Sequence, residues 1–229
     1  MKRVLIASAI ALALGCEQTP EEKPRLTTAF AYFYSHQDTQ WVFLDTLYSI
    51  DEPVEDTCGL SGARVSLSVG GALGIPFHED TGRPGMYFLP LMIIPETDYR
   101  LRVESPVGDT YEMSSKSPKR FELLYPREGD TMRFDSLYVV WTEPGNPGYF
   151  LRLYTQDTLR DTPYTYEVMF PVFPNGDTSE SYIPAFYIDT LNYWYDLTIA
   201  GFDTVSSGTD RYHDFAVFWS KRVRVFVKE

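Results

Sequence analysis

The chain has 229 residues, of which 32 are acidic and 20 are basic, so its formal net charge is −12 at pH 7. This charge argues against a nucleic-acid partner, because phosphate binding needs a basic stripe and the chain has only the short set Lys221, Arg222 and Arg224. An anionic surface also argues against adsorption of the protein body to anionic lipid headgroups.

The first sixteen residues have the pattern of an export signal. Lys2 and Arg3 precede an unbroken apolar run from Val4 to Leu14, and small residues then lead to Cys16. This run is well short of the roughly 20 apolar residues that a membrane-spanning helix needs. We therefore expect the segment to be cleaved, with no transmembrane span after it.

The cleavage site resembles the lipobox of bacterial lipoproteins, since it reads Ala13-Leu14-Gly15-Cys16. The resemblance implies a signal peptide over residues 1–15, an acylated Cys16 and a tether over residues 16–24. In such lipoproteins Glu17 is compatible with sorting to an outer membrane. The cleavage-site sequence departs from the usual lipobox at Ala13, where leucine is most common. An alternative is an A-x-A site at Ala11-Leu12-Ala13, which would leave Cys16 free to pair with Cys58.

We expect the mature chain to be all-β. Tyr, Phe, Val and Thr are abundant, Pro and Gly are scattered along the chain, and no helical period persists after Cys16. Residues 27–35 and 40–49 suit a hairpin. Two further stretches alternate apolar and polar residues as a half-buried strand does, with Val65, Leu67 and Val69 in one and Tyr99, Leu101 and Val103 in the other.

Residues 60–115 resemble the transthyretin-like or carboxypeptidase-regulatory-like β-sandwich. The similarity rests on Ser61 to Leu67, on Gly85-Met86-Tyr87 and on Thr97 to Val103. The pattern is also similar to a family of uncharacterised outer-membrane lipoproteins for which no activity is implied. We assign this first sandwich to residues 25–117, up to the polar joint of Ser115 to Arg120.

The second region resembles a fibronectin type III sandwich. A strand ending in Trp141 is followed by a turn and by the strand Tyr149 to Tyr154, and Tyr195, Leu197 and Ile199 alternate further on. We assign it to residues 118–229. The predicted fold class is thus all-β, with two consecutive immunoglobulin-like or fibronectin type III-like β-sandwiches after a cleaved signal peptide.

Aromatic residues crowd one long stretch of the second region, and we expect a binding surface there. A glycan could stack on exposed rings in this stretch, although core packing is the usual role of such residues. The candidate ligand-binding aromatics are Tyr164, Tyr166, Tyr182, Tyr187, Tyr193 and Trp194.

No catalytic, metal or cofactor motif is evident. The chain lacks a G-x-S-x-G elbow, a phosphate loop and an H-E-x-x-H pair. The acidic loop from Asp51 to Asp56 could hold calcium but lacks the D-x-D-x-D-G pattern, and His36, His78 and His213 are far apart. We predict no metal, no cofactor and no enzymatic activity, and a buried structural role for Cys58.

The function expected from these features is binding or scaffolding of another component of the bacterial cell envelope. The protein would be exported and lipid-anchored to the outer membrane, on its periplasmic face or at the cell surface. Its expected partners are the lipid bilayer, through acylated Cys16, and an envelope protein or a glycan. Carbohydrate binding is the alternative function, and an envelope enzyme with an unfamiliar site is a remote one.

Overall fold

A computed structural model describes residues 26–47, 59–159, 162–172, 179–183, 193–207 and 213–228. Within these ranges the chain consists of strands, turns and loops, with one short 3-10 turn at Phe134–Ser136. None of the described segments forms a helix that is long and apolar enough to cross a membrane. The predicted all-β fold is confirmed. The signal peptide, Cys16, the tether and Cys58 lie outside the described residues.

The described strands form one long sheet and two small ones. The long sheet runs in the order β13 (Thr162–Val172), β12 (Gly148–Leu159), β15 (Tyr193–Ser207), β16 (His213–Lys228), β1 (Leu26–Tyr34), β2 (Thr39–Leu47), β6 (Met86–Pro90) and β5 (His78–Glu79), with β10 (Thr131–Arg133) beside β16. One small sheet has the order β4 (Ile75–Pro76), β3 (Arg64–Val69), β7 (Asp98–Glu104) and β8 (Thr110–Lys116). The other has the order β14 (Ser179–Tyr182), β11 (Tyr138–Trp141) and β9 (Leu123–Tyr125).

Each small sheet packs on one half of the long sheet, which gives two sandwiches. In the first, Tyr99, Leu101 and Val103 of β7 are buried as their alternation predicts, and they share a core with Phe215 and Val217 of β16. In the second, Trp141 of β11 shares a core with Tyr195, Leu197 and Ile199 of β15, again in the predicted alternation. Leu, Ile, Val and aromatic side chains fill both cores, as two packed inner faces require.

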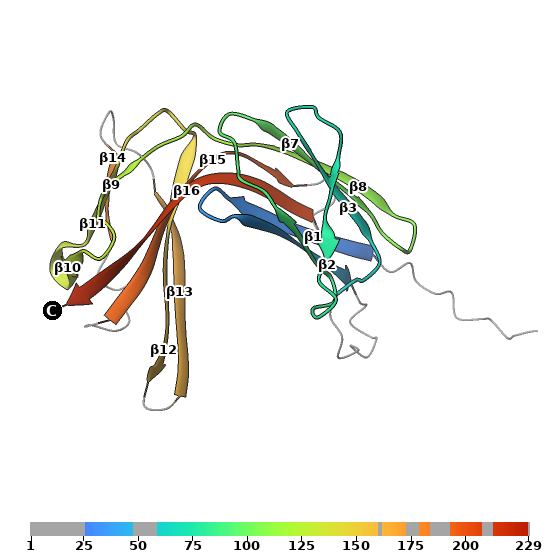
Figure 1. The fold of residues 1–229 in the computed structure, drawn as a ribbon. Helices are drawn as coiled ribbons and strands as arrows, with labels where there is room; N and C mark the ends of the chain where they lie inside the picture. The colour runs from blue at the N-terminus through green and yellow to red at the C-terminus, as the bar shows by residue number, and fades with distance from the viewer. Residues whose placement is uncertain are drawn as a thin grey trace, which may run out of the picture.

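The last strand belongs to both sandwiches. β16 pairs in parallel with β1 from Ala29 opposite His213 to Tyr34 opposite Phe218, and it pairs antiparallel with β15 along most of its length. Its final residues, Val225 and Val227, lie in the second core. Figure 1 shows this strand running from one sandwich into the other. The division into residues 25–117 and 118–229 stays a prediction, because the C-terminal strand contributes to both cores.

The turn between β1 and β2 is fastened to β16. The Ser35 amide donates to the Phe218 carbonyl over 3.1 Å, and the Ser35 hydroxyl donates to the Ser220 carbonyl over 3.0 Å. In return the Ser220 amide donates to the Ser35 hydroxyl over 2.7 Å. The two sandwiches form the limbs of an arch, and the strands of the long sheet pass along its concave side (Figure 1).

Candidate binding groove

The face of the long sheet that points away from both cores is unusually aromatic. The outward face of a half-solvated antiparallel sheet is normally polar. Here β1 places Ala29, Ala31 and Phe33 inward, and its residues of opposite parity, Phe30 and Tyr32, are exposed at 37% and 43%. On β2 and β6 the same outward parity carries Trp41 and Phe88, whose ring centroids lie 5.4 Å apart.

A groove of about 450 Å³ follows this face across five adjacent strands. We call it the aromatic groove. It is lined by Tyr32, Tyr34, Tyr149, Phe150, Met169, Pro171, Phe202 and Phe218. The groove brings together residues from β1, β12, β13, β15 and β16, so it exists only when the first and the last described strands are both in the sheet.

The floor of the aromatic groove is a cluster of mutually packed rings. Tyr34 and Phe218 stack with centroids 5.1 Å apart and an interplanar angle of 17°. Phe150 meets Phe218 edge-on at 5.1 Å and 86°, and it meets Tyr34 edge-on at 6.4 Å. These are the stacked and edge-to-face geometries that aromatic pairs favour, so the floor is preorganised.

Gly148 sets the position of Phe202 in the groove. A Cβ atom at Gly148 would lie 2.4 Å from the Phe202 Cζ atom, which is closer than real Cβ atoms approach. The two residues are direct partners in the β12–β15 ladder. Only a residue without a side chain lets the Phe202 ring lie against this part of β12.

Polar groups stand at the rim of the groove. The Tyr32 hydroxyl donates to Asp214 over 3.3 Å, and the Arg152 Nε donates to Glu167 over 2.8 Å. Burial raises the pKa of Tyr34, and burial followed by the charge of Asp214 raises the pKa of Tyr32. Both phenols are therefore neutral near pH 7. The groove offers apolar surface with a polar rim, which suits an apolar side chain of a ligand or partner.

His36 stands beside this surface, where the β1–β2 turn meets β16. Its Nδ1 lies 2.7 Å from the Ser220 hydroxyl. Burial first, and then the positive charges of Arg222 and Arg152, lower the pKa of His36 to about 4. The imidazole is therefore neutral near pH 7 and acts as a hydrogen-bonding part of the junction.

The six aromatic residues singled out from the sequence do not form one surface among the described side chains. Tyr166 and Tyr193 are half-buried and pack against the second core. Trp194 points the other way, is 42% exposed and meets Phe226 edge-on at 5.4 Å, with the Arg224 guanidinium 5.6 Å from its ring centroid. Tyr187, and the side chains of Tyr164 and Tyr182, lie outside the described part of the chain. Ligand binding by this set stays a prediction.

Sequence reasoning missed most of the groove, although a signal was present. The strand TTAFAYFYS is apolar at both parities, and so is Phe215 to Trp219. A strand that is apolar on both faces indicates that both faces are covered or used. Met169 and Pro171 do lie in the long aromatic stretch in which a binding surface was expected.

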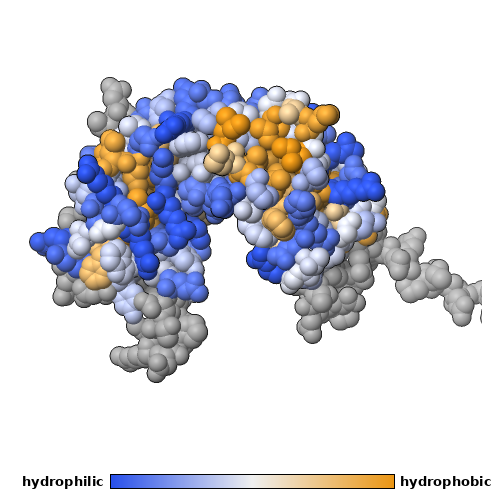
Figure 2. All heavy atoms as spheres, in the orientation of Figure 1, coloured by the Kyte–Doolittle hydropathy of each residue, from blue (hydrophilic) through white to orange (hydrophobic). Residues whose placement is uncertain are grey.

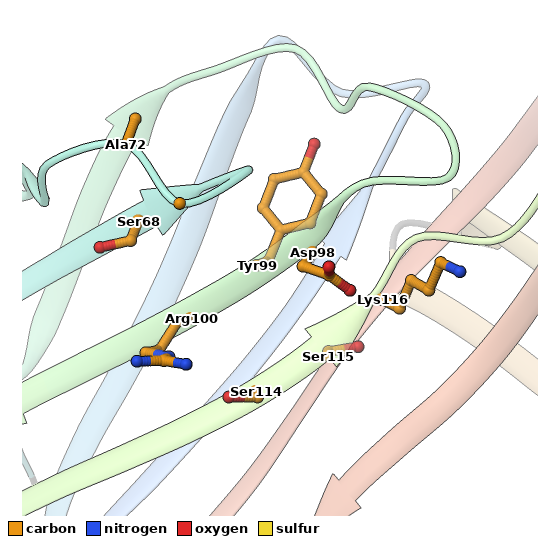
Figure 3. A pocket seen from close by; sticks show the side chains of 9 residues that line it. Ser68, Ala72, Asp98, Tyr99, Arg100, Ser114, Ser115 and Lys116 are labelled. Atoms are coloured by element: carbon orange, nitrogen blue, oxygen red, sulfur yellow. The ribbon is translucent and has the colours of Figure 1, made fainter.

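A second, more polar hollow of about 620 Å³ lies on the small sheet of the first sandwich (Figure 3). Ser68, Arg100 and Ser114 are neighbours across β3, β7 and β8, and the Tyr99 ring points to the other side of β7. Arg100 is already paired with Glu112 at 3.1 Å. Because its guanidinium has a partner, this hollow is a weaker binding candidate than the aromatic groove.

No group of three or more His, Cys, Asp or Glu side chains in the described ranges could hold a metal ion. His78 packs on Phe88 at 5.6 Å, and the acidic loop from Asp51 to Asp56 lies outside those ranges. The absence of a metal site therefore stays a prediction.

The chain matches no protein-family model and no curated protein. It is similar in fold to solved structures of all-β modules. One is a cytokine receptor complex, with 11% sequence identity and a TM-score of 0.29, and the match covers 86% of this chain and 95% of that one. Another comprises the fibronectin(III)-like modules of CbhA from Clostridium thermocellum, with 12% identity, a TM-score of 0.23 and coverage of 89% of this chain and 94% of that one. A third is the IG1+IG2 part of DIP-gamma, with 9% identity, a TM-score of 0.24 and coverage of 90% of this chain and 99% of that one.

These likenesses describe the fold class alone, and at such TM-scores they carry no functional argument. The predicted class, an all-β chain of β-sandwiches, is confirmed by the packed sheets, and the similar solved structures include fibronectin(III)-like and IG modules. The transthyretin-like character of residues 60–115 stays a prediction. A fold of this kind does not specify a function, which lies in the site that each protein carries.

Proposed function

We propose that this protein is a non-enzymatic lipoprotein of the bacterial cell envelope that binds another envelope protein in the aromatic groove. The mature chain begins at acylated Cys16, and residues 16–24 tether the arch to the outer membrane. The absence of a recognisable catalytic motif in the sequence supports the non-enzymatic part of this proposal. The lipobox-like sequence supports the anchor.

One observation carries the binding role: the solvent face of the long sheet holds a groove of packed aromatic rings where polar residues are the rule. An exposed apolar patch with a polar rim is typical of a protein interaction site. The groove favours a protein over a glycan as its occupant, because the Tyr34 and Phe218 faces are engaged with each other. This stack occupies one face of each ring and so reduces the flat aromatic surface that a sugar could use.

The test is in-cell crosslinking of the tagged full-length protein, followed by mass spectrometry of what it captures. We expect one envelope protein to be enriched, and we expect Tyr32→Asp and Met169→Asp to abolish its capture. Both side chains are exposed, Met169 at 59%, so these variants should keep the fold. The matched control is Trp194→Ala, on the same strand face as Phe202 but eight residues away, or about 26 Å. Capture that survives both groove variants would refute the proposal.

Carbohydrate binding is the second candidate, and the exposure of Trp194 is the observation that favours it. Trp194 offers an accessible ring beside Arg224, which is an arrangement that can stack on and hydrogen-bond to a sugar. This site would be separate from the groove.

A further inference from the structure

We propose that two apolar loop segments of the first sandwich rest in the surface of the bilayer that holds the lipid anchor. The inference rests on the proposed lipid anchor, because that anchor makes the bilayer the nearest large surface. The loops are residues 70–74, between β3 and β4, and residues 91–97, between β6 and β7. They and the adjoining strand residue Ile75 carry what we call the aliphatic patch, formed by Leu73, Ile75, Met92 and Ile94.

The aliphatic patch is far more exposed than apolar side chains of a soluble surface normally are. Leu73 is 93% exposed, Met92 is 78% exposed and Ile94 is 54% exposed. Figure 2 shows hydrophobic side chains gathered over these loops, on the convex side of the first sandwich. Exposed apolar residues gathered in this way mark a surface that something else covers.

The two loops belong to one surface, because the start of β7 is bonded to both. The Gly70 amide donates to the Asp98 carbonyl over 2.8 Å. The Ile94 amide donates to the Tyr99 hydroxyl over 2.7 Å. Since Asp98 and Tyr99 are consecutive, Gly70 and Ile94 are held on either side of the same strand end.

The composition of the patch fits lipid better than protein. Residues 70–75 and 90–95 read GGALGI and PLMIIP, and neither run contains a charge. The centres of protein interfaces are enriched in Trp, Tyr and Arg, whereas Leu is under-represented among the residues that dominate binding. Aliphatic side chains in runs of this kind are suited to the boundary between headgroups and acyl chains, and the charged Glu96 follows the second run, where it can stay at the level of the headgroups.

Several backbone groups of the loops are satisfied from within the protein, which favours insertion into an apolar medium. The Ile94 amide donates to the Tyr99 hydroxyl, and the Ser117 hydroxyl donates to the Ile94 carbonyl over 2.6 Å. The Ala72 amide donates to the Val69 carbonyl over 3.0 Å, and the Leu91 amide donates to the Asp38 carbonyl over 3.0 Å. These loops can leave water without leaving those donors and acceptors unpaired.

The tether is long enough to allow this contact. Leu26 begins β1 at the opposite end of the sandwich from the loops, because the adjacent Thr27 hydroxyl lies 3.1 Å from that of Ser105, beyond the far end of β7. The seven residues of β7 span about 23 Å. The chain from Cys16 to Leu26 reaches up to about 33 Å when extended. A lipid on Cys16 and the aliphatic patch can therefore occupy the same bilayer, and the concave side then faces away from it.

The test uses the mature chain with Cys16→Ser, which cannot carry an acyl group, and neutral phosphatidylcholine vesicles in a flotation assay. We expect this chain to float with the vesicles. The double variant Leu73→Asp/Met92→Asp should lower its partitioning by roughly tenfold or more. The matched control Val107→Asp changes a residue that is 59% exposed in the β7–β8 turn, and it should bind as the parent does.

The remaining arms separate this proposal from its rivals. Because the attraction is apolar and the protein is acidic, high salt should not release it and anionic lipid should not strengthen it. A Cys16→Ser chain that stays with the soluble fraction would overturn the proposal. So would binding that the double variant leaves unchanged, or a double variant that changes self-association in place of vesicle binding.

The outcome is independent of the aromatic groove, since variants of the groove should float with the vesicles as the parent does. It is also independent of Cys16 acylation, which is measured separately by the mass of the native N-terminal peptide.

Discussion

Tyr34 and Phe218 stack their rings 5.1 Å apart, and this contact joins the first described strand to the last. The pair lies in the parallel ladder between β1 and β16, next to the Ser35–Ser220 hydrogen bonds. The floor of the aromatic groove is therefore also the seam, by which we mean the junction between β1 and β16. Changes in this seam should affect both stability and binding.

Phe218→Ala should lower the free energy of unfolding by about 3 kcal/mol, because it removes a ring that three other aromatic side chains contact. Tyr32→Ala should lower it by less than about 1 kcal/mol, since its side chain is largely at the surface. Urea denaturation followed by tryptophan fluorescence measures both values. Equal losses in the two variants would mean that Phe218 does not act as the packed centre of the seam.

Gly148→Ala should displace the Phe202 ring and lower the free energy of unfolding by about 1–3 kcal/mol, because the new Cβ atom would collide with that ring. It should also weaken capture of the groove partner. Gly82→Ala is the control: the nearest atom to its Cβ would be an Asp80 oxygen at 3.4 Å, an ordinary contact. Thermal unfolding of the two variants is compared with the parent. A Gly148→Ala variant as stable as Gly82→Ala would show that Phe202 can move freely.

His36 should make stability depend on pH between about 4 and 6.5. In this window the unfolded imidazole binds a proton and the folded one, with its pKa lowered to about 4, does not. The contribution is fully present above pH 6.5 and is lost as the pH falls toward 4. For the partly solvated His36, we expect the stability difference between the parent and His36→Gln to shrink by about 1–2 kcal/mol across the window. Denaturant titrations at several pH values measure this difference, and a constant difference would contradict the assignment.

Trp194→Ala tests the carbohydrate alternative. If Trp194 binds a glycan, the variant should lose retardation in affinity electrophoresis through polysaccharide gels while its melting temperature stays within a few degrees of the parent. Because Trp194 is 42% exposed, we expect the fold to survive the change. Under the proposal that the groove binds a protein, the variant migrates as the parent does. A large fall in melting temperature would assign Trp194 to the core instead.

The strand pattern of the chain could be predicted because it depends on local alternation. Tyr99, Leu101 and Val103 face the first core, and Tyr195, Leu197 and Ile199 face the second, as period-2 burial requires. The hairpin of β1 and β2 also follows the prediction, with Ala31 opposite Val42. In each case the information lies within a few neighbouring residues.

The aromatic groove could not be predicted in the same way because it depends on pairing between distant strands. Nothing local indicates that Tyr34 lies beside Phe218, since the two are joined only by the parallel β1–β16 ladder. The crowding of Tyr166, Tyr193 and Trp194 in the sequence misled for the opposite reason. Successive residues of a strand point to opposite faces, so Tyr193 and Trp194 cannot serve one surface.

Site-specific photo-crosslinking in cells tests the central claim most directly. A photoreactive amino acid replaces Met169 in the aromatic groove. In a parallel strain it replaces Leu124, which is 50% exposed on β9, in the small sheet of the second sandwich. The account predicts that the probe at position 169 captures one envelope protein, that the probe at position 124 does not, and that Tyr32→Asp removes the product. Equal capture from both positions, or none from position 169, would contradict the claim that the groove is the binding site.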